Sequence, residues 1–203
     1  MIIERPPRIF RWLVPGAEFR RKGEGERMVY LTFDDGPIPE ATPEVLDILD
    51  RYGVKATFFM VGDNVRKYPA LLEEVKRRGH RVGNHTMHHL QGSGVTTRTY
   101  LRDVCEADEL IGSDLFRPPH GWLRPRQTLA LRSKYRIVMF DLVTRDYSKH
   151  VDAPGVVENV KRYSRPGTII VFHDSLKSIH KLRTALPESI EWLMSRGYEF
   201  GIL

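Results

Sequence analysis

Residues 28–53 have the sequence MVYLTFDDGPIPEATPEVLDILDRYG, which joins a strand pattern to a helix pattern. The apolar run at 28–33 is rich in aromatic and aliphatic side chains, as is typical of a strand covered on both faces. Residues 42–44 then suit a helix start, with a capping hydroxyl, a proline and an acid in the first turn. Apolar residues over 45–49 form one helix face, and Gly53 ends the helix. The stretch therefore predicts one βα unit.

The same alternation recurs along the rest of the chain. Strand-like runs lie at 28–33, 56–61, 80–84, 115–117, 136–141, 168–173 and 198–202. Helical patterns lie at 42–52, 69–78, 97–111, 125–134, 154–163 and 187–196. Seven strands that alternate with six helices predict parallel βαβ units and an α/β fold. A closed or nearly closed barrel fits this count, and an open doubly wound sheet is the alternative. In both, the site lies beyond the carboxyl ends of the strands.

Composition limits the class of protein. The chain has 203 residues, 41% hydrophobic and 29% charged, as in a globular protein that buries a core. Its 32 basic and 26 acidic side chains leave a net charge of +6. Because Cys105 is the single cysteine, an internal disulfide framework and a zinc site built from several thiolates are excluded.

The N-terminal stretch bears on location and partners. Glu4, Pro6 and Pro7 interrupt the apolar run of a signal peptide, and no stretch approaches the ~18 apolar residues of a membrane span. We therefore expect a cytoplasmic protein with no membrane span. No nucleic-acid-binding motif accompanies the basic residues of this stretch, so we expect a solvated basic face and no nucleic acid partner. These residues are Arg8, Arg11, Arg20, Arg21 and Lys22.

Two adjacent carboxylates follow the first strand, in the sequence TFDDGP at 32–37. One carboxylate can bind a cation while its neighbour moves protons, so Asp34 and Asp35 are candidates for a metal or acid–base site. Asp-Gly-Pro is also ordinary turn chemistry, so the motif alone is a mild signal of function.

Three histidines within five positions follow the third strand. His85 and His89 are four residues apart, so a helical segment would place both imidazoles on one face. With one carboxylate they can form a three-ligand metal site, which leaves a coordination position open as catalytic metals require. His88 has the poorer spacing for this role.

Other strand ends also carry polar side chains. The fourth strand leads into FRPPHG at 116–121, the fifth into Asp146 and Tyr147, and His173 ends the sixth. A histidine at a strand end can serve as a proton donor near neutral pH. A rigid surface loop and ordinary capping are the structural alternatives, and Asp174 is expected to cap the segment that follows it. Because five strand ends carry acids, histidines or arginine, we expect these side chains to converge.

Five short motifs give the chain a resemblance to a known family. They are Thr32-Phe33-Asp34-Asp35-Gly36, His85-Thr86-x-x-His89, Arg117-x-Pro119-x-Gly121, the Asp146-aromatic pair and Val171-x-His173. In order and spacing the chain resembles, from about 28 to 203, the polysaccharide deacetylases with a NodB homology domain (carbohydrate esterase family four). The resemblance implies a distorted (β/α)7 barrel in a single domain, which removes acetyl groups from N-acetylated sugars. Residues 1–27 precede the region of resemblance, and we expect them to form an N-terminal extension that packs on the barrel.

The resemblance further implies a metal site. Asp35, His85 and His89 would bind a divalent metal ion, usually Zn²⁺, although relatives also accept Co²⁺ or Ni²⁺.

The catalytic groups are implied in the same way. Asp34 would be the general base and His173 the general acid. Arg117 would orient the base, and Asp146 would set the orientation and pKa of His173.

Loop residues would contact the N-acetylated glycan: Pro119, His120, Gly121 and Tyr147. His120 stands where the family often has an aromatic residue, and Tyr147 where tryptophan is common. The backbone N–H of His120 would still complete an oxyanion hole, but both departures leave the identity of the glycan open.

Two other functions are alternatives to a deacetylase. A non-catalytic carbohydrate-binding barrel would not need the base and the acid, both of which this chain retains. A hydrolase of another carbon–nitrogen bond would be favoured if activity proved independent of metal.

Overall fold

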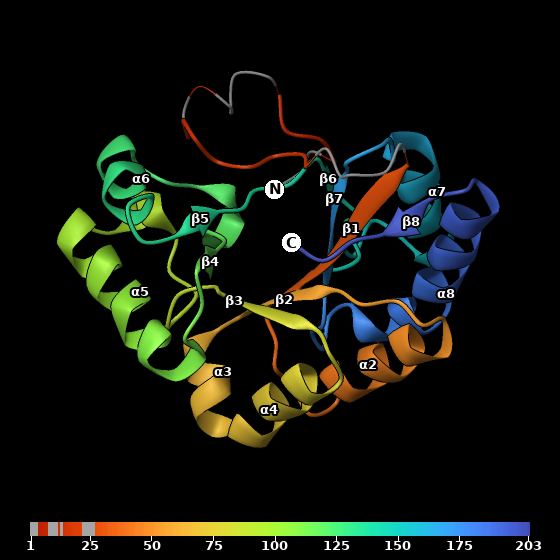
Figure 1. Ribbon diagram of the computed structural model, residues 1–203, viewed down its shortest axis with the longest axis horizontal. Helices are drawn as coiled ribbons and strands as arrows, with labels where there is room; N and C mark the ends of the chain where they lie inside the picture. The colour runs from red at the N-terminus through yellow and green to blue at the C-terminus, as the bar shows by residue number, and fades with distance from the viewer. Residues whose placement is uncertain (1–3, 8–11, 13, 22–26) are drawn as a thin grey trace.

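A curved, largely parallel β-sheet lies at the centre of the computed structural model, and helices cover its outer side (Figure 1). The structure describes residues 4–7, 12, 14–21 and 27–203. The strands are β1 (Met28–Asp34), β2 (Thr57–Met60), β3 (Arg81–Asn84), β4 (Leu115–Phe116), β5 (Arg136–Ile137), β6 (Leu142–Val143), β7 (Ile169–His173) and β8 (Glu199–Phe200). The α-helices are α2 (Thr42–Arg51), α3 (Gly62–Lys67), α4 (Pro69–Arg77), α5 (Thr97–Ile111), α6 (Pro125–Leu131), α7 (Ala153–Tyr163) and α8 (Ile179–Ser195). Two short 3₁₀ helices are η1 (Gly92–Gly94) and η2 (Pro119–Gly121).

Parallel pairing brings the carboxyl ends of the strands to one rim. β1 pairs with β2 on one side and β7 on the other, so Asp34 lies opposite both Phe59 and His173. β3 continues the sheet beyond β2, and Asn84 at its end lies opposite Phe116 of β4. Polar residues that end or follow these strands therefore start from the same rim, as the strand pattern predicts.

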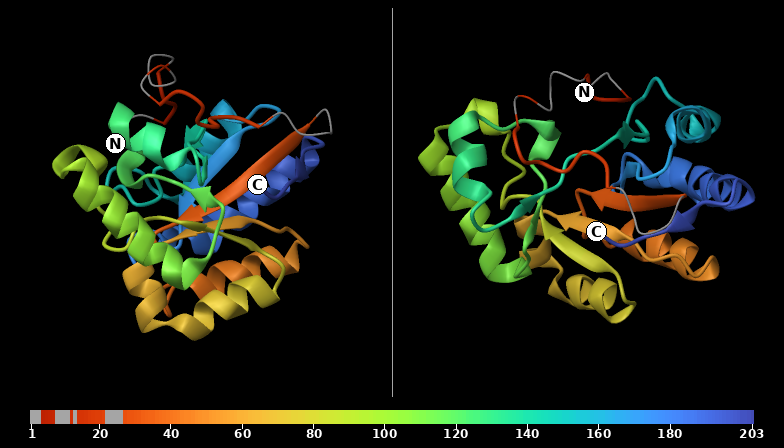
Figure 2. Two further views of the ribbon diagram at one scale, coloured as in Figure 1. Left: turned by 60° about the vertical axis from the view of Figure 1, so that its left-hand side comes forward. Right: turned by 45° about the horizontal axis from the view of Figure 1, so that its top comes forward.

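The sheet is a barrel opened at one seam. Its strands run in the order β5-β4-β3-β2-β1-β7-β6, with β8 beside the start of β1. The single-domain α/β barrel is confirmed, as a half-barrel (Figure 2). The single strand predicted at 136–141 is wrong, because this segment passes from one edge of the sheet to the other. Val138 donates its N–H to Phe116 in β4 at 2.8 Å, whereas Asp141 donates to Ile169 in β7 at 3.1 Å.

The described part of the N-terminal stretch lies across this seam. Met139 donates its N–H to the carbonyl of Glu18 at 2.8 Å, and Arg21 donates to the carbonyl of Gly167, just before β7, at 2.9 Å. This short stretch therefore connects the segment after the edge strand β5 with the segment before β7. The extension predicted at 1–27 also includes positions that lie outside the described residues, namely 1–3, 8–11, 13 and 22–26.

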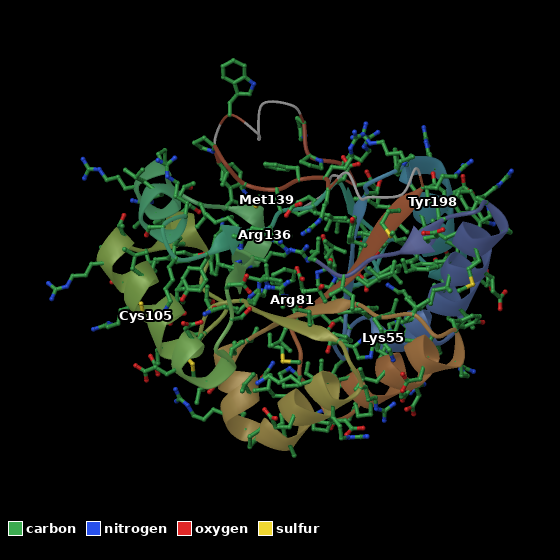
Figure 3. The ribbon with its side chains drawn as sticks, viewed as in Figure 1. Lys55, Arg81, Cys105, Arg136, Met139 and Tyr198 are labelled. Atoms are coloured by element: carbon green, nitrogen blue, oxygen red, sulfur yellow. The ribbon has the colours of Figure 1, made fainter. Side chains whose placement is uncertain are left out.

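Side chains along β1 point alternately to the apolar core and to the face of the sheet that carries the site. Val29, Leu31 and Phe33 belong to the apolar core between the sheet and its helices. Thr32 and Asp34 point to the inside of the curve, because side chains alternate between the two faces of a strand. Cys105 is exposed on the outer helix α5 (Figure 3).

Two helices differ from their predictions. α8 begins at Ile179 and contains Pro187, which was predicted to start it. Proline removes one helical hydrogen bond, but the buried side chains of Ile179 and Leu182 keep the earlier turns packed on the core. α3 was not predicted, since only Gly62 and Val65 are buried and no apolar stripe marks it. In the described part of the chain, none of the helices has the length and apolar character that a bilayer crossing requires.

Gly83 in β3 tests the packing inside the sheet. A Cβ at this position would lie 2.5 Å from Cδ1 of Phe59 and 3.2 Å from Cβ of Leu115. We expect Gly83→Ala to lower the free energy of unfolding by about 1–3 kcal/mol, because overpacking displaces neighbouring side chains. Gly94→Ala is the control, since nothing lies within 4 Å of its new Cβ. Denaturant unfolding measures both variants, and equal losses would contradict this packing.

Candidate active site

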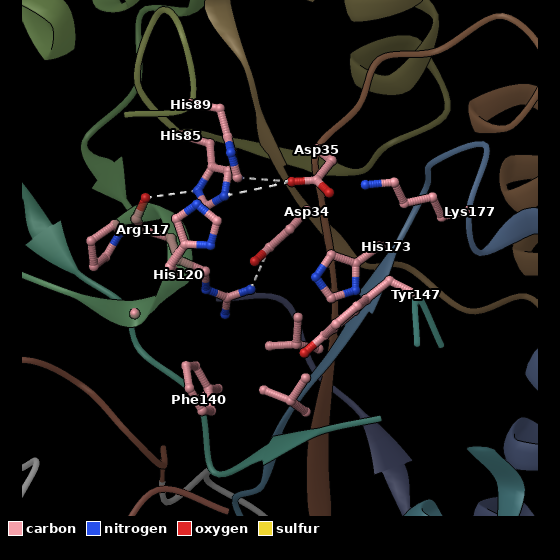
Figure 4. Close-up of a pocket in the computed structure, with 14 residues that line it drawn as sticks. Asp34, Asp35, His85, His89, Arg117, His120, Phe140, Tyr147, His173 and Lys177 are labelled. Carbon is pink, nitrogen blue, oxygen red and sulfur yellow. Dashed lines mark hydrogen bonds and ion pairs between the residues drawn. The ribbon is translucent and has the colours of Figure 1, made fainter. Parts of the chain in front are cut away.

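A pocket of about 200 Å³ opens at the rim where the parallel strands end (Figure 4). The sequence-predicted residues that line it are Asp34, Asp35, His85, His89, Arg117, His120, Gly121, Tyr147 and His173. Two predicted residues are not part of the described lining. Pro118 takes the place expected for Pro119, and Asp146 is buried behind His173.

Asp35, His85 and His89 converge on one point of this pocket (Figure 4). Nε2 of His89 lies 3.2 Å from Oδ1 of Asp35, and Nε2 of His85 lies 3.9 Å from it. One ligand atom from each residue lies within 4.8 Å of the other two. Two imidazoles and one carboxylate are the donor set of open, catalytic zinc centres, so these residues fit a divalent metal ion.

The protonation of these groups also suits metal binding. Nδ1 of His85 lies 2.8 Å from the carbonyl oxygen of Arg117, which can only accept, so Nδ1 carries the proton and Nε2 is free to bind. Burial lowers the pKa of His85 to about 4, which keeps the ring neutral. Burial raises the pKa of Asp35, but the hydrogen bond from His89 and the charge of His173 outweigh it. The pKa of Asp35 therefore lies well below its ordinary value.

The loop after β3 corrects the helical spacing argument. His85 and His89 are not on a helix, because the side chain of Asn84 accepts the N–H of Thr86 at 2.8 Å and turns the chain. Thr86 and His89 then have left-handed backbones, with φ of 68° and 53°. A turn, not a helix face, therefore brings both rings into the pocket. Among the described residues, His88 does not belong to the metal-ligating group.

Arg117 lies beneath the pocket with 1% of its surface exposed. Its Nη1 donates to Oδ1 of Asp34 and to Oγ1 of Thr32, both at 2.7 Å. Its Nη2 donates to the carbonyl of Met139 at 3.0 Å, and the guanidinium lies 4.1 Å from the centre of the Phe59 ring. Burial lowers the pKa of Arg117, and the charge of Asp34 opposes this. The pair holds the Asp34 carboxylate in one orientation at the base of the pocket.

His173 faces the pocket from the end of β7. Its Nδ1 lies 2.8 Å from Oδ1 of the buried Asp146, and its backbone N–H donates to Oδ2 at 2.7 Å. Lys181 donates to the backbone carbonyl of Asp146 at 2.8 Å and fixes that loop. Burial lowers the pKa of His173, but the charges of Asp146, Asp35 and Asp34 outweigh it and raise the pKa to about 9. The ring is therefore protonated at neutral pH and can donate from its other nitrogen.

Asp174 does not cap a helix, contrary to expectation. It is buried, and its carboxylate accepts the Thr42 hydroxyl at 2.6 Å and the Gly36 N–H at 3.1 Å. Burial raises the pKa of Asp174 to about 8. A Cβ on Gly36 would lie 2.0 Å from this carboxylate, so the turn after Asp35 requires glycine. The sequence shows an acid next to His173, but it does not show that this acid binds Thr42 and Gly36, which are distant in the chain.

The two predicted substrate residues with unusual identities lie beside functional rings. His120 has a left-handed backbone with φ of 59°, and its ring packs edge-on against His89 with centroids 4.8 Å apart. Tyr147 packs edge-on against His173, also at 4.8 Å. Both side chains therefore contact groups of the pocket directly.

Besides Pro118 and Val171, which stand inside quoted motifs, three lining residues were not predicted from the sequence. Phe140 and Val143 form an apolar part of the lining, and Lys177 reaches the pocket from the loop after β7 (Figure 4). None of them belongs to a motif. Their only sequence signal is a position near the carboxyl end of a strand, where many residues have no function.

Comparisons with known proteins show the family to which the chain is similar. The family model for polysaccharide deacetylases matches residues 21–139. A peptidoglycan-N-acetylglucosamine deacetylase of Bacillus cereus is 33% identical over 186 residues, which cover 86% of this chain and 85% of that protein. A chitooligosaccharide deacetylase of Sinorhizobium fredii is 39% identical over 163 residues, covering 76% and 75%. The crystal structure of the Bc1960 peptidoglycan N-acetylglucosamine deacetylase has a TM-score of 0.89 at 30% identity, covering 98% of this chain and 95% of that one.

Fold, site and relatives together define a hydrolase that acts on a carbon–nitrogen bond other than a peptide bond. The chain belongs to the polysaccharide deacetylase family, and it is a carbohydrate N-deacetylase. Deacetylases of this family are metalloenzymes, which agrees with the cluster of Asp35, His85 and His89.

Asp146→Asn removes the charge that raises the pKa of His173. In metal-free protein we expect His173 to titrate at about 9 in the wild type, and at lower pH in the variant, because burial is then less opposed. NMR titration of the His173 ring protons measures both midpoints. Asp50→Asn, on the outer helix α2, is the control and should leave the midpoint in place. An unchanged midpoint in Asp146→Asn would show that Asp146 does not set this pKa.

Proposed function

We propose that this chain hydrolyses the N-acetyl group of N-acetylglucosamine units in a glycan, which yields acetate and a free amine. One observation supports this most directly: Asp35, His85 and His89 share a single pocket with Asp34 and His173. Amide hydrolysis needs an activated water, a proton acceptor and a proton donor for the leaving nitrogen. The pocket holds candidates for all three requirements.

Asp35, His85 and His89 would hold the metal ion, which we propose to be Zn²⁺. Co²⁺ and Ni²⁺ are the alternatives, because imidazole and carboxylate donors suit all three ions. When bound, the ion supplies Lewis acidity that acidifies water and polarises the acetamide carbonyl.

Asp34 takes the proton from the attacking water in this mechanism. The ion pair with Arg117 keeps its carboxylate aligned, so little reorganisation is needed when water attacks. The guanidinium of Arg117 donates to Asp34, Thr32 and the carbonyl of Met139, so we propose that it acts through Asp34.

His173 protonates the departing nitrogen. An amine leaves poorly as its anion, so the tetrahedral intermediate collapses to products only when a proton reaches the nitrogen. The Asp146 carboxylate keeps the ring oriented and, together with the charges of Asp35 and Asp34, raises the pKa of His173 to about 9, so the acid form is available at neutral pH.

The rest of the pocket would position the acetyl group. The backbone N–H of His120 is the candidate donor to the developing oxyanion. Phe140, Val143 and Val171 form a small apolar cluster in the lining, which can receive the acetyl methyl group.

The relatives support the proposed sugar. Their names specify peptidoglycan N-acetylglucosamine and chitooligosaccharides, two substrates that share N-acetylglucosamine. Acetate release from chitooligosaccharides and from peptidoglycan tests the proposal and compares the two glycans. A carbohydrate-binding barrel would bind these glycans without releasing acetate. A hydrolase of another carbon–nitrogen bond would remain active after metal removal.

His85→Ala tests the metal assignment. We expect metal affinity and acetate release to fall by more than about 100-fold, since loss of a direct ligand exceeds the ~10–100-fold effect of losing an outer-shell partner. Elemental analysis and the acetate assay measure the two losses. His180→Ala, exposed on α8, is the matched control and should change neither. Full metal content and activity in His85→Ala would rule out this ligand set.

Asp34→Asn separates the base from the ligands. The amide cannot accept the proton, so we expect the rate of acetate release to fall by roughly 10²–10⁴-fold while the metal content stays at the wild-type level. Retained activity would exclude Asp34 as the base. A loss of metal would instead place Asp34 among the ligands.

A further inference from the structure

The loop that carries His85 and His89 has an unfavourable backbone conformation at two positions. Thr86 and His89 both have positive φ, at 68° and 53°, which costs free energy in residues other than glycine. Both histidines must nevertheless direct Nε2 towards Asp35. Groups outside the loop therefore have to fix its backbone.

The carbonyl side of this loop is fixed by α3. The first two residues of that helix, Gly62 and Asp63, donate their N–H groups to the carbonyls of Thr86 and Met87, both at 2.9 Å. N–H groups in the first turn of a helix have no partner within the helix, so they are free to bind the loop.

The N–H side of the loop is fixed by Asp103 of α5. Oδ2 of Asp103 accepts the N–H of Met87 at 2.8 Å and the N–H of His88 at 3.1 Å. Its Oδ1 lies 2.6 Å from Nδ1 of His88. One carboxylate therefore contacts the two consecutive residues that lie between Thr86 and the ligand His89.

Asp103 is a charged residue on the buried side of α5. It is 6% exposed and lies on the same buried side of α5 as Tyr100, Val104 and Ala107. A buried carboxylate is costly unless it is hydrogen-bonded, and its partners here are the loop groups. Asp103 does not line the pocket, so it cannot take part in proton transfer to the substrate.

We propose that Asp103 is a positioning residue for the metal centre: it locks the loop so that His85 and His89 face Asp35. The same inference gives the third histidine its role. His88 is not a metal ligand but a further contact for Asp103, with its ring half exposed on the outer side of the loop. The inference rests on the metal site of the proposed function and adds a residue that touches neither metal nor substrate.

Asp103→Ala removes both acceptor atoms from the loop. We expect its affinity for Zn²⁺ or Co²⁺ to fall by about 10–100-fold, the usual effect of losing a partner that orients metal ligands. Asp103→Asn keeps one oxygen that can accept from both backbone N–H groups, so its loss of affinity should be smaller. His88→Ala should still bind one metal ion per chain. Glu109→Ala, which removes an exposed acid from the same helix, is the matched control and should bind as the wild type does.

Equilibrium dialysis with Zn²⁺ or Co²⁺ measures these affinities without reference to activity. The visible absorption of bound Co²⁺ reports its coordination, and circular dichroism of the metal-free variants shows that they are folded. If Asp103→Ala does not fold, folded Asp103→Asn decides the question: a metal affinity below that of both the wild type and Glu109→Ala supports the positioning role, and an affinity equal to theirs overturns it.

The outcomes separate the two proposals. Wild-type protein that binds no metal would overturn the metal site itself. Wild-type affinity in folded Asp103→Ala and Asp103→Asn would leave that site standing and overturn the positioning role. Loss of the metal ion in His88→Ala, with Asp103→Ala unaffected, would make His88 a ligand and contradict the inference.

Discussion

The buried ion pair between Arg117 and Asp34 is the contact on which the rest of the site depends. A guanidinium with 1% exposure is tolerated only where its charge and its donors are satisfied, and Asp34 supplies the opposite charge. The same arginine binds the carbonyl of Met139 at the open seam of the sheet, and its own carbonyl accepts Nδ1 of His85. Arg117, which follows β4, thus contacts the proposed base Asp34, the proposed ligand His85 and the seam of the sheet.

Environment gives chemically identical side chains opposite roles in this pocket. His85 and His173 are both enclosed, and burial by itself lowers the pKa of each. His85 hydrogen-bonds to a backbone carbonyl and stays neutral, which suits a metal ligand. His173 lies against the buried carboxylate of Asp146 and stays charged, which suits an acid. The difference arises from the partner of Nδ1, and each partner comes from a different strand end.

The open seam of the sheet allows residues between β5 and β6 to line the pocket. Because the chain between β5 and β6 leaves one edge of the sheet for the other, its residues line the pocket without continuous pairing. Phe140 reaches the pocket from this crossing, and Val143 from the short strand that follows. Opposite them, the metal loop is held between α3 and α5 by its backbone groups. Rigid helices thus support irregular loops where the chemistry occurs.

The sequence by itself determined the alternation of strands and helices and the placement of the carboxylates and histidines at strand ends. These features depend on neighbouring residues, through apolar periodicity, proline and glycine. They made Asp34, Asp35, His85 and His89 candidates, and the family resemblance then implied that Asp35, His85 and His89 bind the metal. Tertiary structure alone decided where the segment at 136–141 divides, that the histidine loop turns at Asn84 rather than forming a helix, and that α8 continues through its proline. It also gave two buried acids, Asp103 in α5 and Asp174 after β7, their partners. Those outcomes rest on contacts between residues far apart in the chain, whose free energy outweighs local preference and leaves no periodic trace in the sequence.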